Sequence, residues 1–229
     1  MIRNGLVVVG AAGALGESCC AAAGSRAEVI LRFDEKEDAN KGVLGCDLQD
    51  DAQIQKALSA IPFSQAEKWH LLVTSGIYTG NKTSLDWVDL RKSLNINLIG
   101  VTLFVTGFVQ SLLSYGHRAR IVVVSSAAAR VGSRDIGYGT AKAGIEGLVR
   151  SLSKAYAASG VTTLGLAPGI FASKMSDGQA AERVTAAVDA THLKRMARLE
   201  EISACAMFLV FEAPDALTGT FMSPNGGQV

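Results

Sequence analysis

Short apolar runs recur along the chain, separated by longer segments of mixed polarity. The runs are rich in branched side chains and are apolar at almost every position rather than at every second one. This pattern is typical of strands that are buried on both faces of a sheet. The runs cover residues 6–9, 28–33, 71–74, 121–124, 162–166 and, more weakly, 219–223. We expect each of them to form a strand.

The segments between the runs carry apolar residues at helical spacing. They cover residues 17–23, 50–60, 86–115, 138–158, 179–190 and 200–211. Strands that alternate with helices indicate right-handed crossovers onto a parallel sheet, so the pattern predicts a doubly wound α/β fold. No linker, repeat or low-complexity block divides the chain, and residues 1–229 are expected to form a single domain. Such sheets bind ligands at the carboxyl ends of their strands.

Composition narrows the classes of function. The 22 Lys and Arg residues almost balance the 21 Asp and Glu residues, and no basic stripe is present, which disfavours nucleic-acid binding. The three histidines are isolated from one another and from other metal-ligating residues, so we expect no metal site. The four cysteines form no CxxC pair, which fits a reduced, cytoplasmic chain.

Two apolar segments bear on membrane association. The first, at the N-terminus, is interrupted by Gly10, Gly13 and Gly16, which disfavours a signal peptide. The second, residues 98–113, is interrupted by Thr102, Thr106 and Gln110 and is too short to cross a bilayer. We therefore expect no membrane segment.

A glycine-rich loop joins the first predicted strand to the first predicted helix, with the sequence Gly10-Ala-Ala-Gly13-Ala-Leu-Gly16. Glycine lets the backbone turn sharply and approach a pyrophosphate closely, and the N–H groups that open the helix attract its negative charge. Three glycines in a glycine-rich chain could also form a plain turn. The strand before them and the helix after them favour a dinucleotide site.

Asp34 follows the second predicted strand, at the place where an acid accepts hydrogen bonds from the adenosine ribose hydroxyls. A carboxylate there repels the extra phosphate of NADP, which favours NAD(H). Arg32 and Lys36 could instead receive that phosphate, so NADP(H) remains an alternative, and Asp34 could also be an ordinary solvated acid. Asp47 is a weaker candidate for contact with the adenine.

Tyr138 and Lys142 stand four residues apart on a predicted helix, so their side chains share one face. A phenol with a pKa of about 10 transfers protons poorly at neutral pH unless a nearby cation stabilises the phenolate. Ser125 and Ser126 follow the strand at 121–124, and a serine hydroxyl can donate to or accept from a carbonyl or alcohol oxygen. Together these residues predict proton transfer beside a hydride acceptor.

Further motifs accompany these residues. They are Asn97 in Asn-Leu-Ile-Gly100, Tyr138-Gly-Thr-Ala-Lys142, Pro168-Gly169, and Leu217-Thr-Gly219 with Gly226-Gly227 near the C-terminus. With the glycine loop and Ser126, they resemble the short-chain dehydrogenase/reductase family over the whole chain from residue 6. The resemblance implies a single Rossmann domain, a bound nicotinamide cofactor, and a homotetramer or homodimer built on the two long helices.

The resemblance also implies roles for individual residues. Tyr138 would be the general acid/base, Lys142 would bind the nicotinamide ribose and lower the tyrosine pKa, Ser126 would hold the substrate oxygen, and Asn97 would anchor a water in a proton relay. Ser126 is preferred because it keeps the family's spacing to Gly132, although Ser125 stays a candidate. The implied cofactor contacts are Gly10, Gly13, Ala14, Leu15, Gly16, Asp34, Asp47, Leu48, Ser75, Gly76, Tyr138, Lys142, Pro168, Gly169 and Ser173.

Two departures from the family pattern affect the cofactor site. Val9 stands in place of a threonine before the glycine loop, and the glycine spacing is that of the family's Gly-x-x-Gly-x-x-Gly variant. The usual Asn-Asn-Ala-Gly after the third core strand is Val73-Thr-Ser-Gly76. The hydroxyls of Thr74 and Ser75 can offer hydrogen bonds where the two amides are missing.

These observations lead us to expect an NAD(P)-dependent oxidoreductase that interconverts a secondary alcohol and a ketone of a small-molecule substrate. A 3-oxoacyl thioester reductase is the second hypothesis, because residues 195–202 also resemble such reductases. A dinucleotide-binding sensor or scaffold without catalysis is the third. Residues 171–198, which include several basic side chains, are expected to form a lid over the substrate.

Overall fold

The computed structural model describes residues 3–80, 86–173, 176 and 181–229. Its centre is a sheet of seven parallel strands in the order β3-β2-β1-β4-β5-β6-β7. The strands are β1 (Asn4–Val9), β2 (Val29–Asp34), β3 (Val43–Gly45), β4 (Lys68–Val73), β5 (Arg118–Val124), β6 (Val161–Leu166) and β7 (Phe221–Met222). The strand order reverses between β1 and β4, which is the switch point of a doubly wound sheet. The predicted α/β fold is confirmed.

All six predicted strands are present, and β3 is a seventh that the apolar pattern did not predict. β3 has three residues, and its central Leu44 is exposed, so it contains no apolar run. β4 and β5 begin three residues before the predicted runs, where Lys68 pairs in register with Arg118. Charged side chains fit there because the strands reach the amino edge of the sheet.

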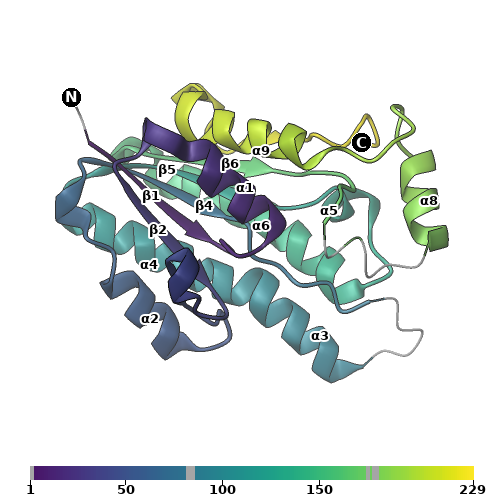
Figure 1. Ribbon diagram of the computed structural model, residues 1–229, viewed down its shortest axis with the longest axis horizontal. Coiled ribbons are helices and arrows are strands. Elements are labelled where there is room, and N and C mark those ends of the chain that lie inside the picture. Colours follow the sequence, from purple (N-terminus) through teal and green to yellow (C-terminus); the bar gives the residue numbers. More distant parts are fainter. Residues whose placement is uncertain (1–2, 81–85, 174–175, 177–180) are drawn as a thin grey trace.

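Helices cover both faces of the sheet (Figure 1). On one face α1 and α9 pack against each other, and on the other face α2, α4 and α6 supply apolar side chains to a second core. The helices are α1 (Ala14–Ala23), α2 (Asp51–Ser59), α3 (Trp87–Leu94), α4 (Val101–Ser114), α5 (Ala128–Val131), α6 (Ile136–Tyr156), α8 (Ala181–Asp189) and α9 (Leu199–Met207). The predicted helix 179–190 corresponds to α8, although residues 179 and 180 lie outside the described residues.

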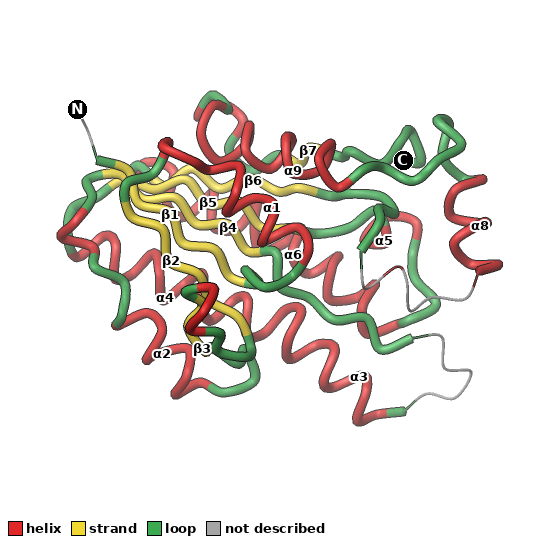
Figure 2. The backbone as a smooth tube through the Cα atoms, in the orientation of Figure 1, coloured by secondary structure: helices red, strands yellow, loops and turns green. Residues whose placement is uncertain are grey.

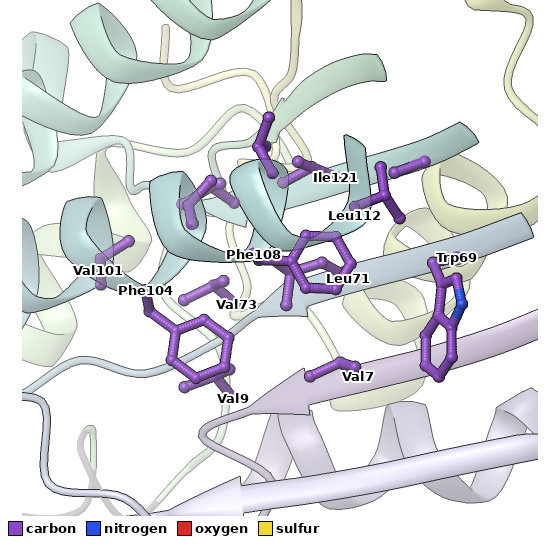
Figure 3. Packing of buried hydrophobic residues seen from close by; sticks show 14 of the residues in the cluster. Val7, Val9, Trp69, Leu71, Val73, Val101, Phe104, Phe108, Leu112 and Ile121 are labelled. Carbon is purple, nitrogen blue, oxygen red and sulfur yellow. The ribbon is translucent and has the colours of Figure 1, made fainter. Parts of the chain in front are cut away.

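The larger core lies between the sheet and α4 (Figure 3). Phe104 and Phe108 of α4 are fully buried there together with Trp69 of β4. Val7 and Val9 face this core, whereas Leu6 and Val8 face α1 and α9. Because both faces of the sheet are covered, the strands are apolar at consecutive positions, which explains the runs in the sequence.

The helical segment Trp87–Ser114 extends beyond residues 98–113, which are its most apolar part. Its length therefore exceeds the length that this apolar part alone indicated. A π-helical turn at Asn95–Gly100 joins α3 to α4. By length and hydropathy alone the segment could cross a membrane. Here Phe104, Phe108 and Leu112 are fully buried against the sheet, as in the core helix of an α/β domain.

Candidate functional site

A cavity of about 660 Å³ opens at the carboxyl edge of the sheet. Its walls come from the loops that follow β1, β4, β5 and β6 and from helices α6 and α8. The loops after β4, β5 and β6 run toward α5 and α8 (Figure 2). This is the place where a doubly wound sheet binds ligands.

The glycine loop forms one wall, to which Gly13, Ala14, Leu15 and Gly16 contribute. A Cβ atom on Gly16 would overlap the carbonyl oxygen of Gly10, so α1 can pack this closely on the loop only with glycine at this position. Gly10 has a φ of +87° and lies behind the cavity, against the backbone of Ser75. The loop thus presents the N-terminus of α1 to the cavity, as a pyrophosphate requires.

Asp34 lies beside this loop, although it does not line the cavity. One carboxylate oxygen accepts the Ala12 N–H at 2.9 Å, and the other accepts the Glu35 N–H at 2.9 Å. The guanidinium of Arg32 donates to the Lys41 carbonyl at 3.0 Å, toward the edge strand β3. The predicted acid therefore stands next to the loop, and Arg32 is directed to a backbone partner.

Asp47 and Leu48 are not brought to the cavity wall. Leu48 is buried, and its backbone touches Gly100 so closely that a Cβ on Gly100 would overlap the Leu48 carbonyl oxygen. A carboxylate oxygen of Asp47 accepts the Gln49 N–H at 2.9 Å. Packing against Gly100, at the start of α4, thus fixes the backbone of this loop, and the expected contact of Asp47 and Leu48 with a cofactor stays a prediction.

The loop after β4 replaces the missing amides with a hydroxyl. Thr74 Oγ1 donates to the carbonyls of Gly10 at 2.9 Å and Val9 at 3.1 Å, which ties this loop to the glycine loop. Gly76 lines the cavity and lies against both Asn97 Oδ1 and Lys142 Nζ. The hydroxyls of Thr74 and Ser75 were expected to offer hydrogen bonds in place of the amides, and Thr74 does so.

The two serines after β5 have different surroundings. Ser125 is buried, and its hydroxyl donates to the Lys142 carbonyl at 2.9 Å, so it anchors α6 to the sheet. Ser126 is partly exposed in the cavity, where its hydroxyl accepts the Ala128 N–H at 3.2 Å and lowers the pKa of Tyr138. The geometry therefore favours Ser126 as the residue that meets a substrate oxygen.

Tyr138 and Lys142 both line the cavity from α6. Lys142 Nζ donates to the Val124 carbonyl at 2.9 Å and lies 5.7 Å from the centroid of the Tyr138 ring. Burial lowers the pKa of Lys142 to about 8. Burial also raises the pKa of Tyr138, the hydrogen bond with Ser126 lowers it, and the charge of Asp135 raises it further. The expected lowering of the tyrosine pKa by Lys142 is therefore not seen, because desolvation of the phenolate dominates.

Asn97 lies in the π-helical turn and is completely buried. Its Nδ2 donates to the Ile77 carbonyl at 2.9 Å and to Ser93 Oγ at 3.0 Å, and its Oδ1 accepts the Ile77 N–H at 2.8 Å. The side chain thus fixes the loop after β4 beside Lys142. π-Helical turns free backbone groups from regular pairing and are frequent at functional sites.

Pro168, Gly169 and Ser173 line the opposite wall, after β6. A Cβ on Gly169 would lie 2.9 Å from the Cα of Asn225, so the glycine permits close packing against the C-terminal turn. Ser173 Oγ accepts the Ser176 N–H at 3.3 Å. Of the predicted lid 171–198, residues 174–175 and 177–180 lie outside the described part of the chain.

Tyr78 and Asp135 were not assigned a role from the sequence, and Arg183 was grouped with the basic side chains of the lid, which could meet an acidic substrate or form a solvated helix face. The Tyr78 ring meets the Tyr138 ring edge to face at 5.6 Å, and the Arg183 guanidinium lies 4.1 Å from the centroid of the Tyr78 ring. Asp135 caps α6 by accepting the Tyr138 N–H at 2.9 Å. An Asp just before a helix is an N-cap signal, so this pattern could have placed the start of α6 before Tyr138. No local signal pairs Arg183 with Tyr78, because the two are far apart in the sequence.

No group of three or more His, Cys, Asp or Glu side chains within the described ranges could hold a metal ion. The glycine cradle at Gly10 and Gly16 and the helix N-terminus beside it fit a dinucleotide. Lys142 and Ser126 lie farther along the same cavity, beside Tyr138. The site can therefore combine a dinucleotide with a proton-transferring tyrosine.

Comparisons with known proteins agree with this geometry. A family model described as enoyl-(acyl carrier protein) reductase matches residues 18–228. Carbonyl reductase family member 4 of Danio rerio is 31% identical over 80% of this chain and 76% of that protein. The 3-oxoacyl-[acyl-carrier-protein] reductase FabG of Buchnera aphidicola is 25% identical over 65% of this chain, and the match spans 59% of the FabG length.

A crystal structure from Agrobacterium tumefaciens with bound NADP superposes with a TM-score of 0.85 and 22% identity, covering 99% of this chain and 96% of that one. This likeness shows the fold. The matched relatives are named as reductases, which confirms the predicted oxidoreductase class at the level of the family. The motifs, the fold and the family match together show that the chain belongs to the short-chain dehydrogenase/reductase family.

Proposed function

We propose that the protein is an NAD(P)-dependent oxidoreductase that interconverts a secondary alcohol and a ketone. The observation that carries the proposal is that Ser126, Tyr138 and Lys142 line one cavity together with the glycine loop. A nicotinamide dinucleotide, when bound, supplies or accepts the hydride. The relatives and the family model support the proposal by their names.

Different residues of the chain would bind different parts of the dinucleotide. The loop from Gly10 to Gly16 and the N-terminus of α1 would hold the pyrophosphate. Lys142, whose Nζ lies against Gly76, would bind the nicotinamide ribose, and Ser173 would contact the nicotinamide from the opposite wall.

Proton transfer would fall to Tyr138. Its hydroxyl would donate a proton to the oxygen of a ketone, or accept one from an alcohol, while the Ser126 hydroxyl holds that oxygen. Because burial disfavours the phenolate, the charged form needs a cation when the proton leaves, and the ammonium group of Lys142, 5.7 Å from the ring centroid, would supply it. Asn97 would keep the loop beside Lys142 in place and support a proton relay.

The test of this proposal is Tyr138→Phe, measured as NADH- and NADPH-linked turnover of a ketone and alcohol panel. We expect a loss in kcat of about 10²- to 10⁴-fold with unchanged dinucleotide binding by calorimetry. Tyr156→Phe, at the far end of the same helix, is the matched control and should retain full activity. Unchanged turnover in Tyr138→Phe would overturn the assignment.

We also propose a preference for NAD(H), from the Asp34 carboxylate beside the glycine loop. Asp34→Asn keeps an oxygen that can accept the Ala12 N–H and removes the charge. The ratio of kcat/KM for NADH to that for NADPH should fall by about tenfold or more, because repulsion of the extra phosphate is lost. The NADP-bound neighbour favours the opposite preference, and a wild-type preference for NADPH would refute this proposal.

A 3-oxoacyl thioester reductase is the second candidate, favoured by the match to FabG. Including acetoacetyl-coenzyme A in the panel separates it from simple ketone reduction by the ratio of kcat/KM values. A sensor without catalysis would bind dinucleotide and turn over no member of the panel.

We further propose that the protein acts in the cytoplasm as a homodimer or homotetramer. Ile99 in the π-helical turn and Leu103 in α4 are exposed to 50% and 41%, and α6 exposes the small residues Ala143 and Gly147. Exposed apolar side chains on long helices are typical of subunit interfaces.

A further inference from the structure

Arg183 is a half-buried cation in the wall of the substrate end of the cavity. It comes from α8, and its guanidinium lies 4.1 Å from the centroid of the Tyr78 ring. Hydrogen bonds of a guanidinium run in the plane of the group, so contact with a ring face does not compete with them. The ring contact fixes the cation at this wall.

The position of Arg183 relative to Tyr138 follows from two ring contacts. Tyr78 meets Tyr138 edge to face with 5.6 Å between ring centroids. The two separations together set an upper limit of about 10 Å on the distance from the guanidinium to the Tyr138 ring. Arg183 therefore lies at the end of the cavity where the proposed proton transfer takes place. The glycine loop, where a pyrophosphate would bind, forms a different wall.

Cationic side chains outnumber anionic ones in the described part of the cavity wall. Among the described lining residues, Arg134, Lys142 and Arg183 are cationic, and Glu182 is anionic. Lys142 Nζ donates to the Val124 carbonyl and belongs to the catalytic set. Arg134 is exposed, so Arg183 is the partly desolvated cation that a substrate would meet at this end. Desolvated guanidinium groups bind carboxylates through paired, charge-assisted hydrogen bonds.

We propose that Arg183 binds a carboxylate of the substrate, so that the preferred substrates are oxo acids or hydroxy acids whose reacting carbon reaches Tyr138 while the carboxylate reaches Arg183. This inference rests on the proposed oxidoreductase function and names its substrate class. Tyr78 holds the guanidinium in place and separates the carboxylate from the reacting oxygen.

The experiment uses a series of methyl ketones with a terminal carboxylate, from 3-oxobutanoate to 6-oxoheptanoate, each compared with its methyl ester. The wild-type protein should prefer the acid to the ester at one chain length by about 10- to 100-fold in kcat/KM. Arg183→Met should bring that ratio close to one, because the acid should lose far more of its kcat/KM than the ester does.

The matched control is Arg26→Met, because Arg26 also lies over an aromatic ring, 4.9 Å from the centroid of Phe211, and does not line this cavity. It should keep the preference for the acid. Calorimetry of 4-oxopentanoate binding to the protein saturated with oxidised dinucleotide gives a second measurement that does not depend on turnover. Binding should weaken about tenfold or more in Arg183→Met only.

The outcomes separate this inference from the proposed function. Equal turnover of acids and esters by the wild-type protein, or an equal loss for both in Arg183→Met, would overturn the role of Arg183 and leave the oxidoreductase in place. Absence of turnover for every ketone and alcohol would count against the proposed function. In that case, equal binding of 4-oxopentanoate to the wild-type protein and Arg183→Met would overturn the carboxylate site as well.

Discussion

Lys142 is a charged side chain with only 3% of its surface exposed, held in place by one hydrogen bond to a carbonyl. Burial of an ammonium group costs free energy, which is why its pKa falls to about 8. Function at this residue is therefore expected to oppose stability, as is common at active sites.

This opposition predicts a pH-dependent gain in stability for Lys142→Met. Between pH 8 and about 10.4 the unfolded chain holds the lysine proton more tightly than the folded one, so wild-type stability rises with pH through that window. Lys142→Met lacks this cost. Its free energy of unfolding should exceed that of the wild type by about 1 to 3 kcal/mol below pH 8, and the excess should vanish toward pH 10.4.

Urea unfolding at pH 7 and pH 10 measures this difference. Lys154→Met, at an exposed position on the same helix, is the control and should show no excess at either pH. A destabilised Lys142→Met with the same deficit at both pH values would mean that the hydrogen bond to Val124 outweighs the cost of burial.

At the scale of elements, Asp135 couples the start of α6 to the loop after β4. One carboxylate oxygen accepts the Tyr138 N–H at 2.9 Å, and the other accepts the N–H and the hydroxyl of Thr79, each at 2.8 Å. The cap therefore fixes both the first turn of the helix, which carries Tyr138, and the loop that carries Tyr78. A single buried carboxylate positions two sides of the cavity.

Loss of this cap should affect both stability and turnover. Asp135→Ala is expected to lower the free energy of unfolding by about 2 kcal/mol and to reduce kcat about tenfold, because Tyr138 and Tyr78 lose their shared anchor. Asp135→Asn keeps one acceptor oxygen. It should therefore lower the free energy of unfolding and kcat by less than Asp135→Ala does.

Asp50→Ala removes the equivalent cap of α2, which accepts the N–H groups of Ala52 and Gln53 far from the cavity walls. It should lower stability with no change in kcat. Equal effects of the two substitutions on kcat would show that Asp135 acts through general stability alone.

At the scale of the whole molecule, the apolar outer surface of α4 predicts self-association. Leu103→Glu should shift the protein from an oligomer to a smaller species in sedimentation velocity, because a carboxylate would be buried at the proposed interface. Leu44→Glu on the edge strand β3 is the matched control, since Leu44 and Leu103 are exposed to 40% and 41%. A wild-type protein that sediments as a monomer would refute the interface.

The sequence predicted the fold and much of the site for a local reason. Each long strand is buried on both faces and therefore consists of a continuous apolar run. Close approach of the backbone requires glycine at positions 10 and 16. Tyr138 and Lys142 share a helix face because they are four residues apart. β3 escaped prediction because its three residues, one buried, one exposed and one a glycine, are too few to form such a run.

The remaining features depend on contacts between distant segments, and only the tertiary structure decided them. Packing directs the Ser125 hydroxyl to the Lys142 carbonyl, which adds a tertiary argument for Ser126 to the spacing that already favoured it. Desolvation raised the pKa of Tyr138, where the local spacing to Lys142 predicted a lower value. The sequence by itself determined the doubly wound sheet, the glycine loop and the tyrosine–lysine pair. The tertiary structure decided which side chains are buried and that Arg183 contacts Tyr78. Both depend on which surfaces of distant segments pack together and exclude water.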